Sequence, residues 1–178
     1  MSAPAGRSGE PSTRADETTP YTDRPPVPPP PERMTRIDFY VLGTSDPDVR
    51  LELACRLAEK AAGSGRGVFV HGDDRALLEA LDERLWTFRA SSFVPHRLLE
   101  ADASVDRVDE DPVQLSSGAP GPDRRVLVNL ARRVPPFFAR FERALEIVDQ
   151  SEPVRADGRE RYRFYRDRGY PLKHHDVG

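Results

Sequence analysis

The residues best suited to chemistry lie near the C-terminus, in the segment RERYRFYRDRGY (residues 159–170), where arginines alternate with aromatic side chains. On a helix that turns about 100° per residue, five side chains of this region share one face: Arg155, Arg159, Tyr162, Arg163 and Arg166. A guanidinium binds a carboxylate or a phosphate through two parallel hydrogen bonds, and a tyrosine ring adds apolar contact area. We therefore expect this face to bind an acidic peptide or phosphate groups; a solvated basic face is the alternative.

No catalytic motif accompanies this segment. Residues 42–46, Leu-Gly-Thr-Ser-Asp, lack the glycine spacing of a dinucleotide-binding turn, and no GxxxxGK[ST] phosphate loop occurs in the chain. His71 and Asp73 follow a short apolar run, and the carboxyl end of a parallel strand is an active-site position. They are the candidates for acid–base catalysis, and a polar strand end is the alternative. We predict a protein that is not an enzyme and holds no cofactor or metal ion.

The composition limits the class of protein further. The chain has 178 residues and a net charge of −3, so a surface that binds polyanions must be local. Lys60 and Lys173 are the only lysines, and the other cationic side chains are arginines. The single cysteine, Cys55, excludes an intramolecular disulfide and fits a reducing cytoplasm. No run of about 18 apolar residues is present, so we expect no membrane partner.

The chain divides into two parts by composition. Residues 1–33 hold nine of the 18 prolines and very few large apolar side chains. Such a stretch cannot bury enough apolar surface to offset its loss of conformational entropy, so we predict a disordered extension with polyproline II character. Residues 34–178 are predicted to form a single domain. Met34 stands directly before the first predicted strand, and a natural start at Met34 is an alternative to Met1.

Within residues 34–178, apolar runs of strand length alternate with helical patterns. The predicted strands cover residues 36–42, 68–70, 113–115, 126–130 and 146–148. The predicted helices begin at Asp46, at Asp73 or Asp74, at Pro135 and near Arg155. This alternation is typical of a three-layer α/β fold, Rossmann-like, with a mostly parallel sheet and helices on both faces.

Apolar stripes predict which helix faces are buried. In the second helix the inward residues are Leu77, Leu78, Leu81, Leu85 and Trp86. The third helix is predicted to carry Phe137, Phe138, Phe141 and Leu145. The end of the chain, with His174 and His175, is expected to be frayed. Because these two histidines are adjacent, they cannot both face one site on a regular element.

Trp86 and Phe93 admit two interpretations. Trp86 is the only tryptophan, and Phe93 and Pro95 follow it in an extended segment. Aromatic side chains beside such a segment can anchor an interface with a partner, or they can pack into the core. The residue pattern leaves both alternatives open.

Three blocks of the chain resemble the chi subunit family of bacterial DNA polymerase III, which belongs to the clamp-loader assembly. The blocks are IDFYVL (residues 37–42), LDERLW followed by SSFVPH (residues 81–96), and RERYRFYRDRGYPL (residues 159–172). The resemblance covers residues 34–178. It implies a non-catalytic accessory subunit of the replicative polymerase, located in the cytoplasm at the replisome.

The resemblance also implies two binding surfaces. Arg159, Tyr162 and Arg163 would bind the acidic C-terminal tail of the single-stranded-DNA-binding protein, which ends in an aromatic residue with a free carboxylate. Arg155 lies one helical turn upstream, and Arg166 joins this set by its place on the predicted helix face. Trp86 and Phe93, with Pro95 beside them, would face the small psi subunit or a replacement for it. DNA would be contacted only indirectly; the alternative is a module that binds single-stranded nucleic acid itself.

Overall fold

The computed structural model describes residues 34–91, 93–103 and 111–178. The strands are β1 (Arg36–Leu42), β2 (Gly67–His71), β3 (His96–Leu98), β4 (Val113–Ser116), β5 (Arg124–Asn129), β6 (Arg143–Val148) and β7 (Leu172–Val177). The helices are α1 (Pro47–Gly63), α2 (Arg75–Thr87) and α3 (Glu152–Asp167), with a 3₁₀ turn η1 (Phe138–Arg140). The predicted disordered extension, residues 1–33, lies outside the described residues.

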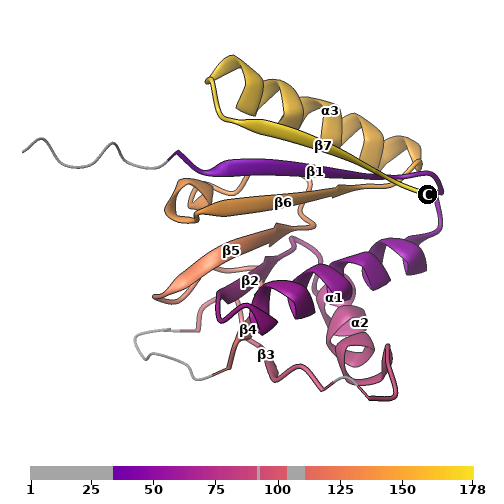
Figure 1. The fold of residues 1–178 in the computed structure, drawn as a ribbon, viewed down its shortest axis with the longest axis vertical. Helices are drawn as coiled ribbons and strands as arrows, with labels where there is room; N and C mark the ends of the chain where they lie inside the picture. Colours follow the sequence, from indigo (N-terminus) through magenta and orange to yellow (C-terminus); the bar gives the residue numbers. More distant parts are fainter. Residues whose placement is uncertain (1–33, 92, 104–110) are drawn as a thin grey trace, which may run out of the picture. The chain divides into compact units, whose positions relative to one another are not determined.

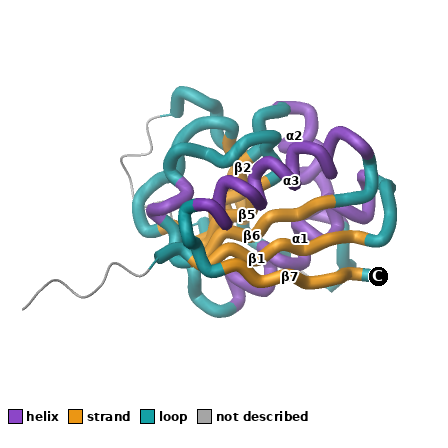
Figure 2. The backbone as a smooth tube through the Cα atoms, turned by 90° about the horizontal axis from the view of Figure 1, so that it is seen from above, coloured by secondary structure: helices purple, strands orange, loops and turns teal. Residues whose placement is uncertain are grey.

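The seven strands form one sheet in the order β3-β4-β2-β5-β6-β1-β7, and each described pair of neighbours is parallel. In Figure 1 the helices α1 and α2 lie on the opposite side of the strands from α3, and in Figure 2 α3 lies in front of the sheet. The predicted three-layer α/β fold is therefore confirmed. Strands β3 and β7 form the two edges of the sheet.

Local sequence explains where the helices begin. The carboxylate of Asp46 accepts a hydrogen bond from the backbone N–H of Asp48 at 2.9 Å, and Asp74 caps α2 by accepting from Ala76 at 3.0 Å. These side chains satisfy N–H groups that a helix leaves unpaired at its start. Helix α3 begins after Ser151, slightly earlier than predicted, with a proline in its first turn, where no N–H donor is needed.

Apolar side chains fill both sides of the sheet. One cluster joins α1 and α2 to the strands and includes the buried Cys55, as expected for a small residue on the apolar face of a helix. Burial raises the pKa of the Cys55 thiol to about 12. The second cluster packs η1 and α3 against the other face of the sheet, through Phe138, Phe141 and Tyr165 among others.

The predicted third helix is wrong. Pro135 and Pro136 lead only into the turn η1, and Leu145 belongs to strand β6 rather than to a helix. The apolar residues at 137, 138, 141 and 145 imitate a helical stripe. However, β6 is a central strand that is buried on both faces, and such a strand reads as a continuous apolar run.

The predicted frayed end is also wrong, because the last residues form β7, which pairs with β1 along its whole length. Strand β7 is polar because it is an edge strand, and edge strands carry charged side chains that discourage further pairing. The short strand β3 at the other edge was not predicted. The expectation that His174 and His175 face different ways holds: His174 pairs with Asp176, whereas His175 binds the buried Asp38.

Candidate functional site

Helix α3 forms one wall of a hollow of about 440 Å³ on the face of the sheet that it covers; we call it the α3 hollow. Its apolar floor consists of Phe39 and Val41 from β1 and Val148 from β6. The wall on α3 is built by Arg155, Arg159 and Tyr162, which lie one turn apart and therefore share one helix face. The remaining rim is formed by Gln150, after β6, and His174 of β7.

Gly158 sets how closely α3 approaches the sheet. A Cβ atom at this position would lie 2.8 Å from Cγ2 of Val148, closer than side chains tolerate. Glycine in a helix interior costs roughly 1 kcal/mol relative to alanine. The sequence accepts this cost here because the bare backbone lets α3 rest on β6 beside the hollow.

The arginines of the α3 hollow keep their charge available. Within the described part of the chain, Arg155, Arg159 and Arg163 make no ion pair with an acid, and Arg155 is half-buried. Tyr162 is 38% exposed, and its ring packs edge-on against Phe39 with a centroid distance of 5.2 Å. An apolar floor below unpaired guanidinium groups suits a ligand that combines an apolar ring with a carboxylate.

The opposite side of α3 is fixed by a buried polar network. Glu146, fully buried on β6, accepts hydrogen bonds from Arg161 (2.7 Å), from the Tyr165 hydroxyl (2.8 Å) and from the Asn129 amide (3.0 Å). Burial, together with the charge of Glu146, raises the pKa of Tyr165 and keeps its hydroxyl a donor. The network binds α3 to β6 and so holds the arginine face over the hollow.

Two of the predicted site residues stay outside the hollow. Arg163 is exposed on α3 and does not line it. Arg166 forms an ion pair with the neighbouring Asp167 at 2.9 Å, and both side chains are exposed. The structure thus brings Arg155, Arg159 and Tyr162 together and leaves Arg163 and Arg166 beside them.

Sequence reasoning missed the other residues of the hollow. Phe39, Val41 and His174 come from strands far from α3 in sequence, and nothing in their local pattern marks a site. Arg161 was not distinguished from its neighbouring arginines. The signal that could have found it is Glu146, an acid in the middle of the apolar run ALEIV, which requires a buried partner.

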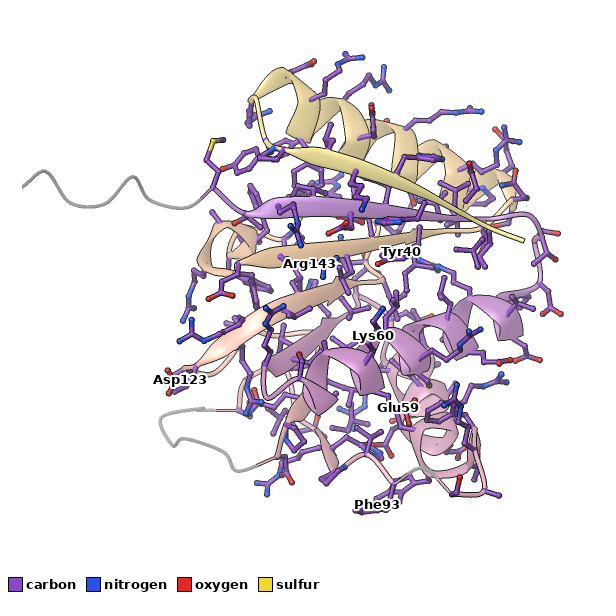
Figure 3. The ribbon with its side chains drawn as sticks, viewed as in Figure 1. Tyr40, Glu59, Lys60, Phe93, Asp123 and Arg143 are labelled. Carbon is purple, nitrogen blue, oxygen red and sulfur yellow. The ribbon has the colours of Figure 1, made fainter. Side chains whose placement is uncertain are left out.

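A second exposed surface lies at the end of α2. The prediction that Trp86 points inward is wrong: Trp86 is 52% exposed and Phe93 is 65% exposed, whereas Leu85 is fully buried. The Trp86 and Phe93 rings are 5.1 Å apart between centroids, and Figure 3 shows Phe93 projecting from the body of the protein. Pro95 is exposed beside them. The alternative in which Trp86 and Phe93 belong to the core is therefore excluded.

His71 lies at a third hollow, of about 610 Å³, at the carboxyl ends of β2 and β5. Burial lowers the pKa of His71, whose Nδ1 donates to the carbonyl of Ser116 at 3.2 Å. The acids and arginines that line this hollow pair with one another: Arg132 binds Asp157 at 3.1 Å, and its backbone N–H donates to Asp73 at 3.0 Å. The hollow that acid–base catalysis would require is present, and the alternative stays a prediction.

No group of three or more potential metal ligands occurs among the described residues. No helix in the described ranges is both long and apolar enough to cross a membrane. The molecule is thus a parallel α/β domain with an arginine-lined hollow near one edge of its sheet and an exposed aromatic pair near the other.

The chain belongs to the DNA polymerase III chi subunit family (HolC), whose family model matches residues 34–173. It is 46% identical over 145 residues to DNA polymerase III subunit chi of Pseudomonas aeruginosa, covering 81% of this chain and 98% of the relative. It is 30% identical to the Haemophilus influenzae subunit (79% and 96% covered) and 29% identical to that of Escherichia coli (78% and 96%). As a family member, it is an accessory subunit of DNA polymerase III in DNA replication.

Among solved structures, T4 UvsW is similar with a TM-score of 0.56 and 9% identity over 82% of this chain and 42% of the UvsW chain. At this identity the likeness concerns the fold alone.

Proposed function

We propose that this chi-family protein connects DNA polymerase III to the single-stranded-DNA-binding protein by holding the acidic C-terminal tail of that protein in the α3 hollow. The second contact, through Trp86, Phe93 and Pro95, is made with the psi subunit or a replacement for it, which links the protein to the clamp loader. The protein works in the cytoplasm at the replisome and performs no catalysis of its own.

One observation carries the proposal: two unpaired arginines, Arg155 and Arg159, stand over an apolar floor. A tail that ends in an aromatic residue presents a ring and a terminal carboxylate together. The ring fits on Phe39 and against Tyr162, and the carboxylate then lies beside the guanidinium groups. The preceding acids of the tail meet the remaining arginines of α3, of which Arg163 is exposed and unpaired within the described residues.

The size of the contributions predicts a modest affinity. An exposed arginine contact contributes less than about 1 kcal/mol, and a partly desolvated bidentate one about 1.5–3 kcal/mol. Added to the burial of one ring, these contributions fit a Kd in the micromolar range, about −8 kcal/mol. Because most of the charges are exposed, we expect the affinity to weaken as salt is added.

The α3 hollow can be tested by titrating a labelled acidic peptide that ends in free phenylalanine against the full chain. Wild type is expected to bind, Arg159→Ala to bind at least about tenfold more weakly if the contact is bidentate, and a C-terminally amidated peptide to bind weakly to both. Arg66→Ala is the matched control, because Arg66 is an exposed arginine outside the hollow. Equal binding by wild type and Arg159→Ala would remove this residue from the site.

The aromatic surface needs a separate test. We expect Trp86→Ala and Phe93→Ala to abolish capture of a psi-like partner from the native cytoplasm while peptide binding in the α3 hollow is retained. Aromatic side chains dominate the energy of many interfaces, and removing one typically costs 2 kcal/mol or more, about thirtyfold in affinity. Unchanged capture by both variants would exclude this surface.

Direct binding of single-stranded nucleic acid by the arginine face of α3 is the alternative function. The apolar floor favours a peptide that ends in an aromatic ring over a phosphate backbone. If nucleic acid bound there, Arg159→Ala would reduce the salt dependence of DNA binding. An unchanged salt dependence argues for the peptide.

A further inference from the structure

A second cationic surface lies on the other face of the sheet, at the amino-terminal ends of β1 and β6. Arg36 and Arg143 are register neighbours on these strands, and with Arg66 they line a separate hollow of about 440 Å³. Lys173 of β7 is in register with Asp38 of β1, and Lys60 lies in the last turn of α1. We call these five cations the basic strip: Arg36, Lys60, Arg66, Arg143 and Lys173.

The strand register places this surface away from the α3 hollow. Leu145 and Ile147 follow Arg143 at even spacing and pack in the α1 cluster, so Arg143 lies on the α1 face of the sheet. Phe39 and Val41, by contrast, lie on the α3 face. Figure 3 shows Tyr40 and Arg143 on the part of the sheet that α1 leaves uncovered. Two separate cationic surfaces therefore occupy the two faces of one sheet.

The guanidinium groups of the basic strip are held in place by one buried carboxylate. Asp38 accepts two hydrogen bonds from Arg143, at 2.9 and 2.8 Å, and lies 3.7 Å from Arg36. It also binds His175 at 2.9 Å. A single carboxylate cannot neutralise all of these cations, so the strip keeps a positive charge while its guanidinium groups stay ordered.

Nearby acids are already engaged elsewhere. Glu142, which lines the same hollow, is paired with Arg125 at 2.5 Å, and Glu59 of α1 is paired with Arg89 at 3.4 Å. Within the described ranges, Lys60, Arg66 and Lys173 make no ion pair with an acid. The basic strip thus presents unpaired cations on a chain whose net charge is −3.

An aromatic pair adjoins these cations. Tyr40 and His175 are register neighbours, their rings stack at 4.5 Å with an angle of 9°, and both are partly exposed. Proteins that bind single strands combine a basic track for the phosphates with aromatic rings that contact bases. We propose that the basic strip binds the phosphate backbone of single-stranded DNA, with Tyr40 and His175 against a base. This contact is additional to the tail contact of the α3 hollow and does not depend on it.

The proposal is tested by fluorescence anisotropy with a labelled oligothymidylate of about 30 nucleotides, longer than the site of a single small domain. For the wild-type full chain we expect binding whose logarithm falls with the logarithm of salt concentration. The slope is about −0.7 for each phosphate contacted, and hence roughly −2 for three contacts.

Two double variants with the same change in charge separate the surfaces. Lys60→Glu with Arg66→Glu removes two cations that make no side-chain contact in the described structure, so the fold is preserved. We expect its DNA affinity to fall at least about tenfold and its salt slope to become shallower by about 1. Arg159→Glu with Arg163→Glu is the control on α3, and its DNA affinity is expected to stay within about twofold of wild type.

Several outcomes would overturn the proposal. The first is an absence of binding at low salt; the second is an equal loss in the two double variants, which would indicate net charge alone. Equally tight binding of a duplex of the same length would contradict the single-strand assignment. Peptide titrations on the same variants keep the tail contact distinct, because Lys60→Glu with Arg66→Glu should retain it whatever happens to DNA binding.

Discussion

Replacing Glu146 by glutamine should destabilise the protein strongly, because it leaves Arg161 without a counter-charge. Glu146 is fully buried and Arg161 is 2% exposed, with 2.7 Å between the Glu146 Oε2 and Arg161 Nε atoms. Glutamine has nearly the same size and still accepts hydrogen bonds from Tyr165 and Asn129. The change is therefore confined largely to the charge.

The magnitude follows from the burial of the pair. Removing one partner of a buried ion pair costs about 3–5 kcal/mol, whereas breaking an exposed pair costs less than about 1 kcal/mol. With a total stability of about 5–15 kcal/mol for a domain, Glu146→Gln removes a large part of it. Glu142→Gln, at the exposed pair with Arg125, is the matched control and should cost less than about 1 kcal/mol.

Urea unfolding of both variants, followed by circular dichroism, measures the difference in the free energy of unfolding. The double variant Glu146→Leu with Arg161→Met should be less destabilised than Glu146→Gln, because it removes both buried charges. If Glu146→Gln and Glu142→Gln lose similar amounts, the network does not fix α3 in the way that its geometry indicates.

Three further predictions concern stability. Hydrogen bonds from His175 and Arg143 outweigh burial and lower the pKa of Asp38, so its contribution is complete above the usual aspartate pKa of about 4 and is lost as pH falls through the lower folded value; Asp38→Asn should flatten this acid limb in unfolding measured against pH. Gly158→Ala places a Cβ atom 2.8 Å from Val148 Cγ2 and should cost about 1–3 kcal/mol; thermal unfolding that shows a gain would contradict the close approach. Trp86→Ala should cost less than about 1 kcal/mol and Leu85→Ala about 2–5 kcal/mol, and urea titrations showing the reverse order would refute the burial assignments.

Most of the fold could be predicted because its signals are local. Strand β1 and helix α1 announce themselves through apolar pattern and the Asp46 cap. Strand β6 was obscured because a strand buried on both faces has no alternation, and the phenylalanines before it imitate a helix. Strand β7 was missed because an edge strand needs few apolar residues when its pairing with β1 supplies the stability.

The candidate site was predictable only on the side contributed by α3. Arg155, Arg159 and Tyr162 lie on one helix face, and helical periodicity alone groups them. The floor of the hollow and the role of Gly158 depend on how α3 packs on the sheet, which no local pattern encodes. Trp86 was misplaced because its position continues the apolar stripe of α2, although the helix ends and the ring turns to solvent.

The most direct measurement of the central claim is a titration of the isotope-labelled protein with the acidic peptide, followed through backbone amide chemical shifts. The account predicts the largest shift changes at Gly158, Tyr162 and His174, around the α3 hollow, with little change at Phe93. These changes should shrink when the peptide's terminal carboxylate is amidated. Changes centred on Phe93, or none around the α3 hollow at saturating peptide, would contradict it.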